Sequence, residues 1–300
     1  GCIDFSDRGR TVADAGLMRN ALACAGALCL PVMVHCEDPR LAAGWAMHEG
    51  AVSTRLGLPG FPAAAEETLI ARDIALAEST GAHLHICQVS TAGGVALIKA
   101  AKARGVRVTA EVSPHHLTLT DRWVLGSLGP KETPPAPAAK QRRRRNPSPE
   151  LGLPSWLDAT LLPPYDPSTR VRPPLRGAED LEALVEGLRD GTIDAIATGH
   201  APQGRAEKER EYGLAEPGIS GLETALALAL TLVHRGELDL VHLVAKLSEG
   251  PAGVLGRSPA TLGPGSPADI VIFDPERPWV VEGADFASRG WLRLEARAVL

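Results

Sequence analysis

The sequence has few aromatic residues, no long apolar run and no excess of positive charge. Aromatic side chains make up 4% of the 300 residues, which excludes the stacking platforms of single-stranded RNA binders. No apolar run reaches the roughly 18 residues that a membrane span needs. The net charge of −5 disfavours a dedicated nucleic-acid binder. The first residues show no basic stretch before an apolar one, so no targeting signal can be read.

Cysteine is scarce and scattered. The five cysteines stand singly, with an odd total and no CxxC pair, which favours buried thiols in a reducing cytoplasm over a disulfide framework. In contrast, 44% of the residues are hydrophobic, enough for a buried core, and global disorder is excluded. The chain begins with Gly1 rather than Met, which suggests an internal piece of a longer protein.

Short β-rich runs alternate with Ala/Leu-rich amphipathic stretches along most of the chain. This order is typical of a parallel sheet covered by helices. In α/β barrels the chemistry lies at the C-terminal ends of such strands, which we call the barrel mouth. The predicted strands cover residues 31–35, 83–89, 106–112 and 193–198, and the predicted helices cover residues 63–79, 94–104, 179–189, 218–233 and 241–247.

Two segments depart from this alternation. Residues 126–166 are rich in proline and contain the run Arg142–Arg145, which predicts a loosely held insertion with a solvated tip. Binding of the arginine run to an acidic partner or a phosphate stays open as an alternative. A Gly-Pro turn and an alternating strand near residues 262–274 predict a small β element. We therefore divide the chain into a barrel part, residues 1–255, and a C-terminal part, residues 256–300.

Seven motifs follow one another outside the insertion. They are His35-Cys36-Glu37, Val89-Ser90-Thr91, Thr109-Ala110-Glu111-Val112-Ser113-Pro114-His115-His116-Leu117, Pro173-Pro174-Leu175-Arg176, Asp190-Gly191-Thr192-Ile193-Asp194-Ala195-Ile196-Ala197-Thr198, Glu207-Lys208-Glu209 and Gly218-Ile219-Ser220-Gly221-Leu222-Glu223-Thr224-Ala225. In content and order they resemble the long-chain (type I) dihydroorotases of the amidohydrolase superfamily. The resemblance extends over nearly the whole chain.

The resemblance implies a (β/α)8 TIM barrel that opens the ring amide of dihydroorotate, or closes carbamoyl aspartate, in pyrimidine biosynthesis. Such hydrolysis uses a divalent metal, usually zinc, which lowers the pKa of a bound water and polarises the amide carbonyl. The strands recognisable here match the fourth to the eighth of that barrel. We therefore expect an α/β barrel that is incomplete at its N-terminus, with edges covered by further chain or by a partner in an oligomer.

The metal ligands that the resemblance implies are mostly replaced. The His-x-His element of the first strand would precede the segment that begins this chain. The Ser-Asp-Asp-Gly motif of the fourth strand reads Ser6-Asp7-Arg8-Gly9, and we place Arg8 where an anion would bridge the metal. His35 matches the ligand of the fifth strand, whereas Gln88 and Gly199 replace a His and an Asp. Arginine has no lone pair to give and repels a dication. His35 is thus the one candidate metal ligand, and we expect no resident cofactor in the chain as given.

Two further replacements lie on the substrate side of the implied site. Arg172 stands where the family has an Asn before Pro-Pro-Leu-Arg, and Gln203 replaces a substrate-contacting His. The general acid/base is lost with Gly199. We therefore assign no catalytic residue and no substrate-binding residue.

Other histidines and acids offer weaker alternatives. The segment His83-Leu84-His85 puts both imidazoles on one strand face, but near the start of the strand, where packing is favoured over metal binding. Of the pair His115-His116, at most one side chain points inward at the barrel mouth. Glu37 and Glu111 could orient a His, although structural ion pairs are favoured.

The replacements favour a dihydroorotase-like protein without hydrolase activity, because they gather at ligand positions while frame-defining residues remain. Some relatives of this kind are structural partners of aspartate carbamoyltransferase, which is therefore the expected partner; neither nucleic acid nor a membrane is expected. The alternative is an active cyclic-amide hydrolase in a fuller-length form, rearranged around His35 with Glu37 or His115. A third reading is a decayed gene product without function.

Overall fold

Five parallel strands form the central sheet, in the order β1-β2-β5-β6-β7. The computed structural model describes residues 2–7, 9–129, 163–259, 261–277, 281, 285–288 and 290. The expected parallel sheet is confirmed, and its order along the sheet is the order along the chain. The strands are β1 (Phe5–Ser6), β2 (Val32–Val34), β5 (Leu84–Ile86), β6 (Val108–Val112) and β7 (Ala195–Ile196).

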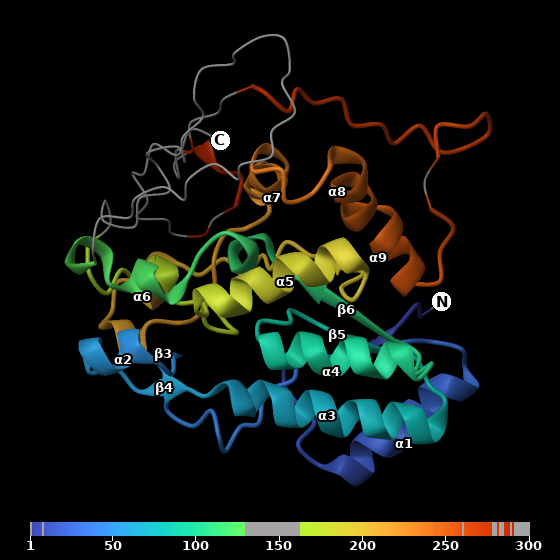
Figure 1. Cartoon of the computed structure of the whole chain (residues 1–300), viewed down its shortest axis with the longest axis horizontal. Coiled ribbons are helices and arrows are strands. Elements are labelled where there is room, and N and C mark those ends of the chain that lie inside the picture. Colours follow the sequence, from blue (N-terminus) through green and yellow to red (C-terminus); the bar gives the residue numbers. More distant parts are fainter. Residues whose placement is uncertain are drawn as a thin grey trace.

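A helix follows each of the first four strands and returns the chain to the start of the next. These crossover helices lie side by side in one layer (Figure 1), with contacts between consecutive members. Three of them were expected from the sequence, whereas the first was not; Asp14 begins it by accepting a hydrogen bond from the Leu17 N–H at 2.7 Å. The helices are α1 (Ala15–Ala27), α3 (Ala63–Thr80), α4 (Ala92–Ala103) and α5 (Ala178–Asp190).

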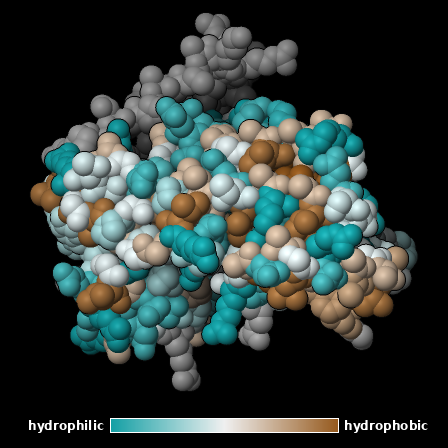
Figure 2. Space-filling model, turned by 90° about the horizontal axis from the view of Figure 1, so that it is seen from below, coloured by the Kyte–Doolittle hydropathy of each residue, from teal (hydrophilic) through white to brown (hydrophobic). Residues whose placement is uncertain are grey.

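One continuous apolar core lies between this helix layer and the sheet. Ile70 of α3, Ile98 of α4 and Leu84 of β5 are fully buried in it. A parallel sheet is buried by its crossover helices, so its strands are made of apolar and β-branched residues. Figure 2 views the face on the side of α1 and α3, where small hydrophobic areas are separated by hydrophilic ones.

The remaining elements surround the ends of the sheet. They are β3 (Met47–His48), α2 (Ala51–Leu56), β4 (Gly60–Phe61), α6 (Arg205–Lys208), α7 (Ala225–His234), α8 (Leu240–Leu247) and α9 (Glu249–Val254), with short 3₁₀ turns at Pro114–Leu117, Asp121–Val124, Gly126–Leu128, Pro167–Thr169 and Tyr212–Leu214. The helix expected from residue 218 begins only at Ala225. The preceding residues run instead beside the end of β7, where Ile219 forms a parallel bridge with His200.

Two expectations about the less regular segments have different outcomes. The predicted C-terminal β element is not formed in residues 261–277, which contain neither helix nor strand; Ile272 is 93% exposed there, because no strand pairs with this stretch in the described residues. Residues 130–162 of the predicted insertion, with Arg142–Arg145, lie outside the described residues. No helix in the described part of the chain is long and apolar enough to cross a membrane.

Both edge strands of the sheet have a single neighbour within the described ranges. Strand β1 pairs with β2, and β7 pairs with β6, so the described strands form an arc and not a closed ring. This arrangement agrees with the second half of a (β/α) barrel. Phe5 on the β1 edge is 43% exposed.

The core position of Leu84 gives a test of this packing. Leu84→Ala removes a fully buried side chain from the central strand β5, and we expect it to lower the free energy of unfolding by about 2–5 kcal/mol. Leu17→Ala, at an exposed position of α1, is the matched control and should have little effect. Urea unfolding of both variants measures the difference; equal effects would contradict the assigned core.

Candidate functional site

A cavity of about 320 Å³ lies at the C-terminal ends of the strands. Residues that follow β2, β5 and β7 meet there with two loops from the second half of the chain. The cavity wall contains all five replaced or matching positions that the resemblance singled out within the described residues: His35, Gln88, Arg172, Gly199 and Gln203. Arg8 lies outside the described residues. Positions more than a hundred residues apart in the sequence, such as His35 and Gly199, thus line one cavity.

His35 is held by Asp7, a residue that the sequence reasoning did not assign a role. The His35 Nδ1 lies 3.1 Å from Asp7 Oδ1, and the His35 backbone N–H donates to Asp7 Oδ2 at 2.9 Å. The Asp7 side chain is only 3% exposed and also accepts from the Gly9 N–H. A carboxylate on one ring nitrogen orients a histidine so that the other nitrogen can meet a ligand. The signal in the sequence was the acid beside the replaced Arg8.

Gly199 makes the closest approach in the cavity wall. Its φ is +59°, and a Cβ built there would lie 2.6 Å from His115 Cε1 and 2.9 Å from Ser113 Cβ. Gln88 approaches from the other side, with its Nε2 at 3.3 Å from the same point. A side chain at position 199 therefore has no room unless His115 moves. An Asp, the residue the family has here, does not fit this wall.

His115 and His116 form a hydrogen-bonded chain through Ser113. The Ser113 Oγ lies 2.9 Å from His115 Nε2 and 2.6 Å from His116 Nδ1. The His116 Nε2 faces the Pro173 carbonyl at 3.1 Å and so carries the proton that is donated there. Burial lowers the pKa of His115 well below its usual value and that of His116 to about 4. Of the pair, His115 lines the cavity, as expected.

Two of the replaced polar residues make contacts of their own at the rim. Arg172 pairs with both carboxylate oxygens of Glu37, at 2.6 and 2.7 Å. The predicted structural ion pair of Glu37 is thereby confirmed, and Arg172 is half exposed, so solvent weakens the pair. Gln203 donates through Nε2 to the Pro217 carbonyl at 3.1 Å. The pair with Arg172 occupies Glu37, one of the two side chains that the alternative hydrolase would recruit.

His83 and His85 share one face of their strand, as the period of two predicts. His83 Nε2 and His85 Nδ1 each lie 2.9 Å from the hydroxyl oxygen of Thr109 on β6. The two imidazoles therefore share one hydroxyl group as a hydrogen-bond partner. His85 also lies beside Glu111, with its Nε2 at 3.3 Å from the carboxylate.

The zinc ion implied by the resemblance does not fit the donors at the barrel mouth. Zinc takes thiolate, imidazole and carboxylate ligands, and His35 with Asp7 is the pair available where Gln88 and Gly199 offer a carboxamide and no side chain. Within the described residues, one group of three potential ligands has donor atoms within 4.8 Å of one another, and it does not include His35. No hydrolytic step through a metal at His35 follows from this arrangement.

The comparisons with known proteins agree with the cavity and the sheet. A model of the dihydro-orotase-like family matches residues 1–93. The dihydroorotase of Pelotomaculum thermopropionicum is 51% identical over 291 residues, 97% of this chain and 59% of that protein. The dihydroorotase of Syntrophus aciditrophicus is 46% identical over 290 residues, with the same coverage. The chain thus spans about three fifths of the length of these curated relatives.

Solved structures show the same fold at lower sequence identity. An L-hydantoinase (dihydropyrimidinase) from Arthrobacter aurescens superposes with a TM-score of 0.71 at 24% identity, over 95% of this chain and 58% of that one. A D-hydantoinase (dihydropyrimidinase) from Thermus sp. gives a TM-score of 0.68 at 24% identity, over 92% and 55%. The sheet therefore belongs to the class of (β/α) barrels that share this fold. Within that class the chain is dihydroorotase-like, by its family match and its near full-length similarity to dihydroorotases.

The close approach at Gly199 gives a stability prediction. Gly199→Ala and Gly191→Ala both place a side chain at positive φ, but a Cβ at Gly191 meets nothing within 4 Å. Because only the Gly199 variant also crowds His115, we expect it to lose about 1–3 kcal/mol more free energy of unfolding. Urea denaturation measures both. Equal losses would show that position 199 has room for a side chain.

The buried His116 gives a pH prediction. Its folded pKa, about 4, lies below the ordinary value of about 6.5, so between these pH values the unfolded chain binds a proton that the folded chain does not. Acidification from pH 6.5 toward 4 therefore removes stability through His116. His116→Gln should lose less stability over this window than the wild type.

The acid response of His116→Gln has to be compared with that of the wild type, because other buried groups also change their protonation in this pH window. The raised pKa values of Asp73 and Asp121, each about 6, act in the opposite direction and are present in both proteins. His242→Gln, at an exposed position, is the control. Urea unfolding midpoints of the wild type and His116→Gln are measured at several pH values. An identical fall of the two midpoints on acidification would contradict a neutral, buried His116.

Proposed function

We propose that this chain is a dihydroorotase-like protein of pyrimidine biosynthesis that has no hydrolase activity and acts as a structural partner of aspartate carbamoyltransferase. The observation that carries the proposal is the wall of the cavity at Gly199. Packing against His115 and Gln88 takes the place of a carboxylate that would bind metal and transfer the proton. The activity of the whole relatives belongs to proteins that are longer than this chain.

The polar residues around the cavity support the same proposal. Both carboxylate oxygens of Glu37 are bound to Arg172, and the Nε2 of His115 lies 2.9 Å from the Ser113 hydroxyl, so a metal bound by these atoms would have to break a contact.

The two edges of the sheet support a role in assembly. Strand β1 and strand β7 each have one hydrogen-bonded neighbour within the described part of the chain, and Phe5 exposes apolar surface at the β1 edge. An unpaired strand edge of this kind binds another chain or further sequence. A structural partner that covers such an edge would stabilise the arc of strands.

One observation favours the alternative of an active cyclic-amide hydrolase. The contact of Asp7 with His35 has the geometry of a carboxylate that orients a metal-binding imidazole. In a fuller-length form, a first-strand His-x-His could complete a ligand set around His35. Such an enzyme would depend on His35 for turnover.

Turnover of dihydroorotate tests the two proposals against each other. The 300-residue chain and a fuller-length form of it, each with and without added zinc, are assayed beside the Pelotomaculum thermopropionicum dihydroorotase as a positive control. We expect no turnover above background, because the donors at positions 88 and 199 are lost. Zinc-dependent turnover that His35→Ala abolishes would establish the hydrolase instead.

Co-elution with aspartate carbamoyltransferase from the same organism tests the partnership. We expect a complex on size-exclusion chromatography, and a weaker one for Phe5→Lys, which places a charge at the β1 edge. Leu17→Lys, on the exposed face of α1, is the control that should still bind. Separate elution of the two wild-type proteins would contradict this part of the proposal.

A further inference from the structure

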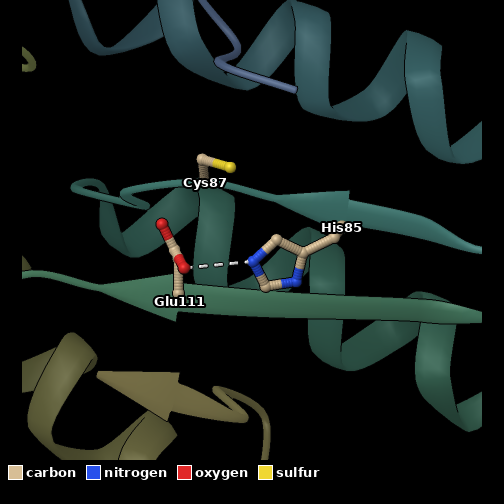
Figure 3. A group of neighbouring side chains, drawn as sticks. All are labelled: His85, Cys87 and Glu111. Carbon is tan, nitrogen blue, oxygen red and sulfur yellow. Dashed lines mark ion pairs between the residues drawn. The ribbon is translucent and has the colours of Figure 1, made fainter. Parts of the chain in front are cut away.

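His85, Cys87 and Glu111 come together on the neighbouring strands β5 and β6 and the residue just after β5 (Figure 3). His85 and Cys87 are two positions apart on and just after β5, so both side chains leave the same face. The register pairs His85 with Thr109, and its continuation puts Cys87 beside Glu111. The ligand atoms of the three side chains all lie within 4.8 Å of one another.

One ring nitrogen of the buried His85, Nε2, makes no hydrogen bond within the protein. Its side chain is 1% exposed, and its Nδ1 is fixed by the Thr109 hydroxyl at 2.9 Å. Its Nε2 is buried without a hydrogen-bond partner and faces Glu111 Oε2 at 3.3 Å. An imidazole nitrogen and a carboxylate oxygen at this distance attract each other only with a proton or a cation between them.

We propose that His85, Cys87 and Glu111 bind a divalent cation of the zinc type, at a site separate from the position that the family uses. None of the three stands at a ligand position implied by the family's motifs. Nitrogen, sulfur and carboxylate oxygen are the donors that zinc prefers, and a thiolate with a carboxylate balances its two positive charges. The site therefore matches the ion in both chemistry and charge.

The distances require only a small adjustment. Zinc bonds of about 2.0–2.3 Å in a tetrahedron place neighbouring donor atoms about 3.3–3.8 Å apart. The separation of His85 Nε2 and Glu111 Oε2, 3.3 Å, already lies in this range. Rotation of Cys87 toward the other two would close the remaining gap.

Binding at this site is coupled to the loss of one proton. Burial, and next the carboxylate of Glu111, raise the pKa of the Cys87 thiol, so the thiol is protonated when no cation is bound. On binding, the bond between sulfur and hydrogen breaks, the sulfur lone pair bonds to the cation, and the proton passes to solvent. Cys87 also lines the cavity, which gives an ion a route in and a water a place as fourth ligand.

Cobalt(II) is the probe that reports on the sulfur ligand. The wild-type chain is titrated with cobalt(II), and then with zinc in competition, while the near-ultraviolet absorption of a cobalt–thiolate bond is followed. We expect one equivalent to bind with this absorption and zinc to displace it. Cys87→Ser should abolish the absorption, and Glu111→Gln should raise the dissociation constant at least tenfold. Circular dichroism checks that each variant is folded.

Cys36→Ser is the matched control, because Cys36, a buried thiol, lines the same cavity as the partly buried Cys87. It should keep the absorption. Alkylation of the unmodified chain supplies a second test without any substitution: zinc should protect Cys87, measured by mass spectrometry of its peptide, more than Cys36. Absorption that survives Cys87→Ser, binding lost with His35→Ala, or no binding at all would overturn the proposal. Hydrolase activity plays no part in these outcomes.

Discussion

The close packing of Gly199 against His115 and Gln88 is the constraint on which this account of the molecule depends. The backbone of residue 199 can approach the two side chains because glycine has no Cβ and adopts positive φ without strain. His115 in turn is fixed by Ser113, and through it by His116. The wall of the cavity is therefore closed by neutral, buried groups where a hydrolytic metal centre needs anionic ones.

Parallel strand order explains why these distant residues meet. Each crossover helix returns the chain to the same end of the sheet, so the segments after β2, β5 and β7 converge on one cavity. The same register places His85, Cys87 and Glu111 deeper in the sheet. The fold thus presents two groups of polar side chains. The group at the barrel mouth has a carboxamide at position 88 and no side chain at position 199, whereas His85, Cys87 and Glu111 offer three potential metal ligands.

Much of the fold and of the cavity could be predicted from sequence. The β-rich runs and amphipathic stretches predicted four of the five strands of the central sheet and three of its four crossover helices, and the positions marked by the family motifs line the cavity. The helix α1 was missed because its segment, Ala-rich with two glycines, has weak periodicity, although Asp14 marks its start. The roles of Asp7 and of Cys87 with Glu111 depend on register and on side-chain rotamers. Sequence spacing alone does not determine those.

The proposed cation site and the replaced positions at the barrel mouth are consistent with the proposed function, a barrel framework without hydrolase activity. A cation bound between β5 and β6 would stabilise the pairing of these two central strands, and a partner chain would cover the edge strands β1 and β7. Diffraction at the zinc absorption edge, from crystals grown with zinc, tests the central claim most directly. The account predicts anomalous density between His85, Cys87 and Glu111 and none beside His35. Full occupancy beside His35, next to Gln88 and Gly199, would contradict it.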